Sequence, residues 1–213
     1  MATDEPRDVT SRTDDAAPDL AEALAIIAAQ RARAEDTRPS GTLLFGIWGV
    51  AWLVGYGALW LTARDGGTPS VLAAAIAIGG GIAAVAVTIV PTTHRTRGIA
   101  GASARQGLLY GLAWPIGFVA QTMIVAGLGQ AGAANEVTAL AANAIAALVV
   151  GLLYIAGGMM LDLTSMYVIG GWMALTGAAA ALAGVPGSYL VMALAGGGGM
   201  LVGALVESVR ARG

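Results

Sequence analysis

The segment Thr138-Ala-Leu-Ala-Ala-Asn-Ala-Ile-Ala-Ala-Leu-Val-Val-Gly-Leu-Leu-Tyr-Ile-Ala-Gly-Gly-Met-Met-Leu161 runs for 24 residues without a charged side chain. An α-helix needs about 20 predominantly apolar residues to cross the hydrocarbon core of a bilayer. Because the segment is long enough and carries one amide as its most polar group, it predicts a transmembrane helix.

The same pattern recurs on both sides of this segment, and turn-forming residues separate the apolar stretches. The predicted spans are 41–63, 71–92, 107–128, 138–161, 164–183 and 187–207. Charged residues in this region lie in connections or at the edges of spans, and they are Arg64, Asp65, Arg95, Arg97, Arg105, Glu136, Asp162 and Glu207. We therefore expect an all-α fold, a polytopic membrane protein built as a six-transmembrane-helix bundle. A re-entrant segment around Asp162 would leave five spans instead.

Composition supports this class and excludes most active-site chemistry. Hydrophobic residues make up 57% of the chain and charged residues 11%, against roughly 25% charged residues in a soluble domain. The chain has no Cys and a single His, His94, which excludes thiolate chemistry and most metal sites. No span contains a Ser with a neighbouring base or a pair of Asp residues. We expect that the protein is not an enzyme and has no catalytic residue, cofactor, metal or nucleic-acid partner.

The arginines are distributed unevenly between the two ends of the predicted spans. With a cytoplasmic N-terminus, the outer loops hold only Arg64, and the cytoplasmic segments hold Arg31, Arg33, Arg38, Arg95, Arg97, Arg105, Arg210 and Arg212. The positive-inside rule therefore predicts a plasma-membrane protein with both termini in the cytoplasm and a basic cytoplasmic tail at 208–213. Arg95, Arg97 and Arg105 belong to one loop, which is expected to contact anionic lipid headgroups.

The first 40 residues differ from the rest, since they hold nine acidic residues and five arginines, a net charge of −4. Residues 1–17 are poor in large apolar side chains, which predicts a disordered acidic tail. In residues 18–40, Leu20, Leu24 and Ile27 recur at i, i+4 and i+7, which predicts an amphipathic cytoplasmic helix followed by a linker. This helix either lies on the membrane surface or docks onto a partner.

Polar side chains inside the predicted spans are the best indication of a functional site, because they are expensive in lipid. Gln121 lies in the third span and Asn143 in the fourth, at equal distance from the loop between them. Two antiparallel helices would bring these amides to the same depth, where a direct hydrogen bond would satisfy most of their polar atoms. The pair is either a structural clamp or part of a solute path.

Two further features predict irregular helices. Pro115 lies in the middle of the third span and is a candidate kink, because proline removes one helical hydrogen bond. The run Gly196, Gly197, Gly198 and Gly199 in the last span weakens a helix and is a candidate hinge. The alternative for the glycines is close packing between helices, which small residues permit in membranes.

Four segments are similar to uncharacterised six-span integral membrane proteins of high-GC Gram-positive bacteria. These segments are Gly49-Val-Ala-Trp-Leu-Val-Gly-Tyr-Gly57, Tyr110-Gly-Leu-Ala-Trp114, Tyr154-Ile-Ala-Gly-Gly158 and Leu194-Ala-Gly-Gly-Gly-Gly-Met200. The resemblance implies the six-span topology, and no functional residue carries over from it.

Two functional hypotheses follow from the sequence. In the first, the protein is a small-solute transporter or the membrane subunit of a transport system, with Gln121 and Asn143 on the solute path. In the second, it is a non-transporting accessory or regulatory protein that binds a partner through the helix within residues 18–40. Besides the lipid bilayer, a second copy of the chain or a partner membrane subunit is compatible with either hypothesis.

Overall fold

The computed structural model describes residues 20–37, 40–95 and 102–212, with side chains for 20–29, 40–90 and 104–212. The predicted disordered tail at 1–17 lies outside these residues. The chain divides into two units, Met1–Arg38 and Pro39–Gly213. In the first unit the described residues form one helix, α1 (Leu20–Thr37).

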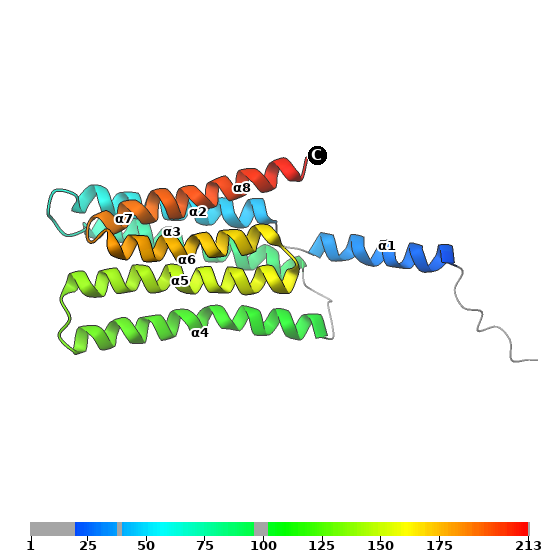
Figure 1. Ribbon diagram of the computed structural model, residues 1–213, viewed down its shortest axis with the longest axis horizontal. Helices are drawn as coiled ribbons and strands as arrows, with labels where there is room; N and C mark the ends of the chain where they lie inside the picture. Colours follow the sequence, from blue (N-terminus) through cyan, green and yellow to red (C-terminus); the bar gives the residue numbers. More distant parts are fainter. Residues whose placement is uncertain (1–19, 38–39, 96–101, 213) are drawn as a thin grey trace, which may run out of the picture. The chain divides into compact units, whose positions relative to one another are not determined.

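The second unit is a bundle of long helices that run back and forth along one axis (Figure 1). Its elements are α2 (Gly41–Ala63), α3 (Val71–Arg95), α4 (Ala102–Gln130), α5 (Asn135–Leu161), α6 (Thr164–Leu182), α7 (Gly187–Val191), the π-helix η1 (Met192–Gly197) and α8 (Gly198–Arg210). The described residues contain no strand. Within the described part of the chain, six spans are long and apolar enough to cross a membrane, and the sixth of them combines α7, η1 and α8. The predicted all-α six-helix bundle is confirmed, and the five-span alternative is wrong.

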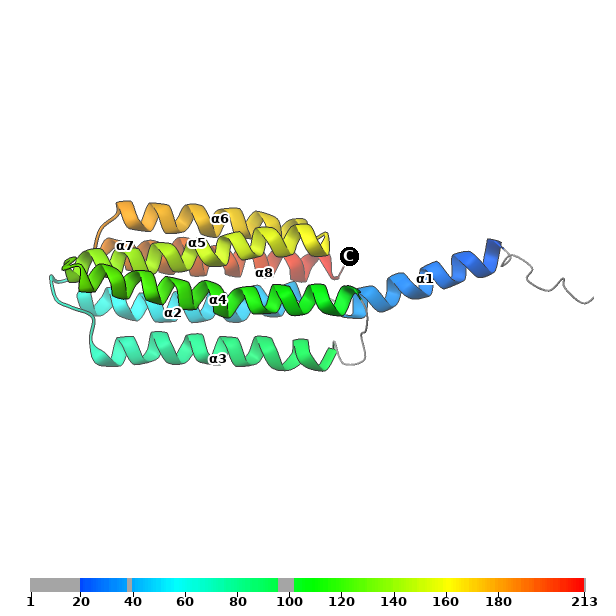
Figure 2. The ribbon, with the colours of Figure 1, turned by 90° about the horizontal axis from the view of Figure 1, so that it is seen from below.

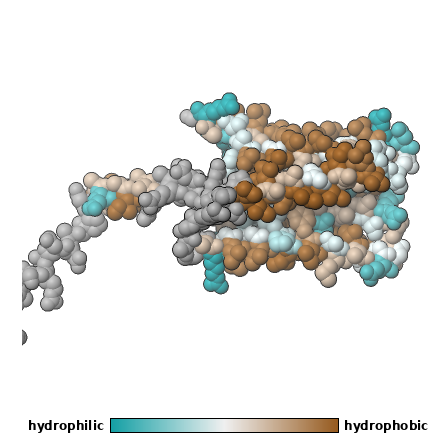
Figure 3. Space-filling model, turned by 180° about the vertical axis from the view of Figure 1, so that it is seen from behind, coloured by the Kyte–Doolittle hydropathy of each residue, from teal (hydrophilic) through white to brown (hydrophobic). Residues whose placement is uncertain are grey.

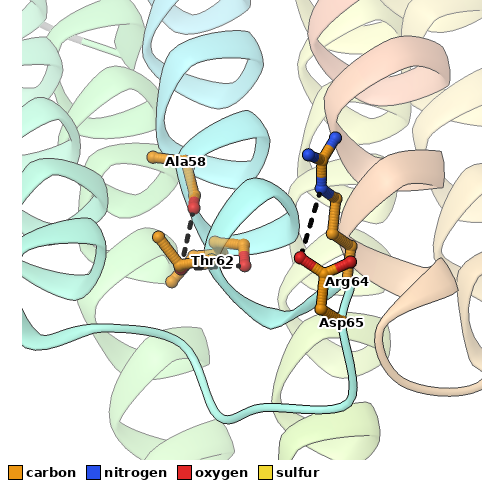
Figure 4. A network of polar contacts seen from close by, with 5 residues as sticks. Ala58, Thr62, Arg64 and Asp65 are labelled. Atoms are coloured by element: carbon orange, nitrogen blue, oxygen red, sulfur yellow. Dashed lines mark hydrogen bonds and ion pairs between the residues drawn. The ribbon is translucent and has the colours of Figure 1, made fainter.

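Local chemistry explains where the helices begin and end. Ser40 caps α2, since its hydroxyl accepts a hydrogen bond from the Leu43 N–H at 3.3 Å. At the other end of α2, Thr62 donates to the Ala58 carbonyl at 3.0 Å, and Arg64 pairs with Asp65 at 3.8 Å (Figure 4). Helix α5 ends at Leu161, and the capping residue Asp162 has a φ of 54°, in the left-handed region that Asp tolerates.

The order of the helices in space differs from their order in the chain. Helix α2 packs against α3 on one side and against the last span on the other, and the last span packs in turn against α6. Helix α5 lies between α6 and α4, and its contact with α6 is the most extensive in the bundle. The described parts of α3 and α4 share no extensive contact, although they follow one another in the chain, and two views show them apart (Figures 1 and 2). The helices thus follow one another in space in the order α3, α2, last span, α6, α5, α4, and this curved row, with α3 and α4 at its ends, encloses the core.

The core lies where α2, α5, α6 and the last span meet. Its largest fully buried side chains are Phe45, Tyr154, Met173, Met192 and Met200. Glycines allow the backbones to approach closely here, because a Cβ on Gly151 would lie 2.7 Å from the Gly170 carbonyl oxygen. Such contacts hold helices together in lipid, where no hydrophobic force drives them to associate.

The outer surface of the bundle is apolar along most of its length. Large apolar side chains are exposed on every span, with Val71 at 87%, Leu175 at 70% and Leu182 at 90% exposure. Figure 3 shows the resulting hydrophobic belt, with hydrophilic residues gathered at the two ends of the bundle. Because this belt would be unstable against water and matches the hydrocarbon core of a bilayer, the chain is a multi-pass integral membrane protein.

Candidate functional site

The Gln121 side chain joins α4 to α5. Its Nε2 donates a hydrogen bond to the backbone carbonyl of Ala142 at 3.0 Å. Since α4 ends at Gln130 and α5 begins at Asn135, the two antiparallel helices are joined by a short turn. Gln121 and Ala142 therefore lie at the same height along the bundle axis. The backbone carbonyl thus holds one end of the Gln121 amide in place.

Asn143, the residue after Ala142, uses a different partner. Its Oδ1 accepts a hydrogen bond from the Tyr56 hydroxyl of α2 at 3.2 Å. The direct hydrogen bond expected between Gln121 and Asn143 is absent: each amide uses one atom for another partner, and the two remaining atoms do not bond to each other. We call Tyr56, Gln121 and Asn143 the amide cluster.

Two atoms of the amide cluster have no hydrogen-bond partner although they are buried. They are the acceptor Oε1 of Gln121 and the donor Nδ2 of Asn143. Leaving a buried polar atom unpaired costs about 1–3 kcal/mol, so a purely structural clamp would be an inefficient use of these amides. The cluster offers one free acceptor and one free donor within the membrane.

Aromatic side chains lie on two of the helices that form the cluster. On α2, Trp52 packs edge-on against Tyr56 with ring centroids 5.4 Å apart. On α4, Trp114 stacks with Phe118 at 6.5 Å and meets Tyr154 of α5 at 5.6 Å. No charged residue lies in the middle of any span. The described residues contain no group of His, Cys, Asp or Glu that could hold a metal ion. The surroundings are therefore neutral and largely apolar.

Sequence reasoning missed two polar residues at the same end of the bundle. The sequence does not distinguish Tyr56 from the tyrosines that are common near membrane interfaces, except by its depth, seven residues before the end of α2 at Ala63. Ser188, in α7, is 0% exposed and its Oγ has no partner. Nothing in its sequence context distinguishes it from a surface serine.

Pro115 lies inside α4, which continues through it as one helix from Ala102 to Gln130. The candidate kink is thus accommodated without a break in the helix. The residue before it, Trp114, faces Tyr154 of α5, so the proline lies beside the contact between these two helices.

The glycine run in the last span coincides with an irregular helix. Residues Met192–Gly197 form a π-helix, and Trp172 of α6 donates to the Ala195 carbonyl at 2.7 Å. A Cβ on Gly197 would lie 2.5 Å from the backbone nitrogen of Leu53. Gly196 and Gly197 therefore depart from α-helical geometry, as π-helices often do at functional sites, and Gly197 packs closely against α2, whereas Gly198 and Gly199 belong to α8.

The opposite end of the bundle carries the arginines proposed to contact lipid. Arg105 is exposed in the first turn of α4, and Arg95 is the last residue of α3. Arg97 and the Arg95 side chain lie outside the described residues.

A shallow pocket of about 200 Å³ near this end is lined by Gly158, Met159, Asp162, Leu163, Thr164 and Tyr167. It is remote from the amide cluster, which lies near the other end of α5.

No protein-family model, no curated protein and no solved structure matches the chain.

Proposed function

We propose that the protein is a small-solute transporter, or the membrane subunit of a transport system, in the bacterial plasma membrane. The observation that carries this proposal is the amide cluster with its two unpaired polar atoms. Polar groups inside a membrane are expensive and often functional, and a substrate path is one of their established roles. Their position between α2, α4 and α5 would allow a solute to contact three spans at once.

Transport is tested with purified protein in liposomes, by light scattering, with acetamide, urea, glycerol and glycine as solutes. At least one of these solutes is expected to enter faster than into protein-free liposomes. The variants Gln121→Leu and Asn143→Leu should each slow this entry about three- to twentyfold, as expected for the loss of a hydrogen bond worth about 0.6–1.7 kcal/mol.

Thr122→Val is the matched control for this experiment. Thr122 is the neighbour of Gln121, but it is exposed and its hydroxyl bonds the Phe118 carbonyl of its own helix at 2.8 Å. The control should transport like the native chain. Entry at the protein-free rate for all four solutes, or equal rates in the Leu variants and the native chain, would contradict the proposal.

The second hypothesis, an accessory membrane protein, is favoured by a separate observation on α1. This helix exposes Leu20, Leu24, Ile26 and Ile27 to the extent of 74%, 56%, 48% and 46%. If these side chains bind a partner subunit, Leu24→Ser with Ile27→Ser should remove that subunit from the natively purified protein. Ala25→Ser with Ala28→Ser, on the same helix, should retain it. Purification of the native chain without another subunit would argue against this role.

We further propose that both termini lie in the cytoplasm, as the distribution of arginines indicates. The chain contains no Cys, so a single introduced Cys reports on one position. A membrane-impermeant maleimide should label Asp65→Cys and Ala131→Cys in intact cells. It should label Ala211→Cys only after the cells are permeabilised. The reverse labelling pattern would show the opposite orientation.

A further inference from the structure

The two unpaired atoms of the amide cluster have complementary hydrogen-bonding character. Gln121 points its Nε2 at the Ala142 carbonyl, which accepts hydrogen bonds only, so its remaining atom is the acceptor Oε1. Asn143 accepts from Tyr56 through Oδ1, so its remaining atom is the donor Nδ2. A ligand that satisfies both must present a donor to Gln121 and an acceptor to Asn143.

The surroundings restrict the charge of such a ligand. The described charged side chains of the bundle lie at helix ends, as Arg64, Asp65 and Glu207 illustrate. An ion moved into an apolar site without a counter-charge pays a large desolvation penalty. A neutral group with a donor beside an acceptor avoids this penalty, and the primary amide is the simplest group that fits both atoms.

The site is closed in this structure. Gln121 Oε1 and Asn143 Nδ2 each expose less than 1 Å², so a ligand reaches them only if a helix moves. Helix α4 is the span that is least buried by its neighbours, since no residue of its most apolar 18-residue segment is buried and its main packing partner is α5 alone. Moving α4 would break one interface, whereas moving α2 or α5 would break several.

We propose that Gln121 and Asn143 form a binding site for an uncharged solute group that carries a hydrogen-bond donor beside an acceptor, as in a primary amide, and that α4 moves away from α5 to admit it. This inference rests on the proposed transport function, for which it names the class of substrate. Its test measures binding, so that the two can fail separately.

A disulfide between α4 and α5 can lock the site shut. A Cβ on Gly117 would lie 4.0 Å from the Cβ of Val149, within the range of about 3.5–4.5 Å that disulfides require. Gly117→Cys with Val149→Cys therefore provides a reversible lock in a chain that has no other Cys. Ala51→Cys with Gly80→Cys is the matched control, since its Cβ atoms would lie 3.9 Å apart and join α2 to α3.

Binding is read from the melting temperature of the purified chain. Acetamide at about ten times its Kd should raise Tm by about 3–6 °C. N,N-Dimethylacetamide keeps the carbonyl but has no N–H donor, so it should give a much smaller shift. The acetamide shift should be lost in Gln121→Met and in Asn143→Leu and retained in Thr122→Val.

The lock separates the movement from the site. Oxidation of the Gly117→Cys, Val149→Cys variant should abolish the acetamide shift and reduction should restore it, while the oxidised Ala51→Cys, Gly80→Cys variant should keep it. An unchanged shift in the oxidised first variant would overturn the role of α4. No acetamide shift in the native chain, or equal shifts with both amides, would overturn the site. An acetamide shift without solute entry into liposomes would refute transport and leave the site standing.

Discussion

Gly170→Val is expected to lower the free energy of unfolding by about 3 kcal/mol, at the upper end of the effect of overpacking a core. A Cβ on Gly170 would lie 2.6 Å from the Gly151 carbonyl oxygen and 2.6 Å from the Ile155 backbone nitrogen. Both are backbone atoms of α5, so no side chain can rotate to make room. The substitution therefore has to push α6 away from α5, at the most extensive interface of the bundle.

The adjacent glycine provides the control. A Cβ on Gly171 would meet no atom within 4 Å, so Gly171→Val should unfold close to the native temperature. Thermal unfolding in detergent, followed by circular dichroism, measures both variants, and size-exclusion chromatography shows whether they remain monodisperse. Equal melting temperatures for the two variants would show that α5 and α6 do not approach as closely as described.

Tyr154→Ala is expected to cost about 3 kcal/mol through the cavity that it leaves in the core. Tyr154 is 2% exposed, and its ring lies 5.9 Å from that of Phe45 and 5.6 Å from that of Trp114. It thus connects α5 to α2 and to α4. Because the reference environment is lipid and not water, the loss comes from packing and ring contacts more than from hydrophobic transfer.

Tyr167→Ala is the matched control, because the Tyr167 side chain is 48% exposed on the outside of α6. Lipid can fill the space that this ring leaves, so the melting temperature should change little. The same thermal unfolding measurement compares the two variants. If Tyr167→Ala destabilised the protein as much as Tyr154→Ala, the burial of Tyr154 at the centre of the core would be disproved.

The helical spans could be predicted from the sequence because the thickness of the bilayer sets their length. The predicted span 41–63 coincides with α2, and the predicted span 164–183 ends one residue after α6. Lengths and turns of this kind depend only on neighbouring residues. The order of helices in space depends instead on which helix faces pack together. No feature of the neighbouring residues predicts that α3 and α4 lie apart.

The glycine runs illustrate the same limit. Gly79 and Gly81 of α3 have open space where a Cβ would lie, whereas Gly157 and Gly158 of α5 face Tyr110 and the backbone of Tyr167. Composition alone predicts close packing for both runs. Whether a glycine is covered depends on the rotation of its helix and on the neighbour, and both are tertiary properties.

The amide cluster was predictable in part. Counting residues from the connecting loop placed Gln121 and Asn143 at one depth, as the bond from Gln121 to Ala142 requires. The third member, Tyr56, comes from a helix far away in the sequence, so no count of residues could identify it. The hydrogen bonds that the two amides form also depend on nearby groups, the Ala142 carbonyl for Gln121 and the Tyr56 hydroxyl for Asn143.

The position of the last span also bears on how the protein is made. It lies between α2 and α6 and provides most of the contact between the two flanks of the bundle. Since the ribosome synthesises this span after the other five, we expect α2 with α3 and α4 with α5 and α6 to enter the membrane before the span that connects them. A nascent chain cut short before Gly187 would lack this connection, and we expect membrane quality-control proteases to degrade it faster than the full chain.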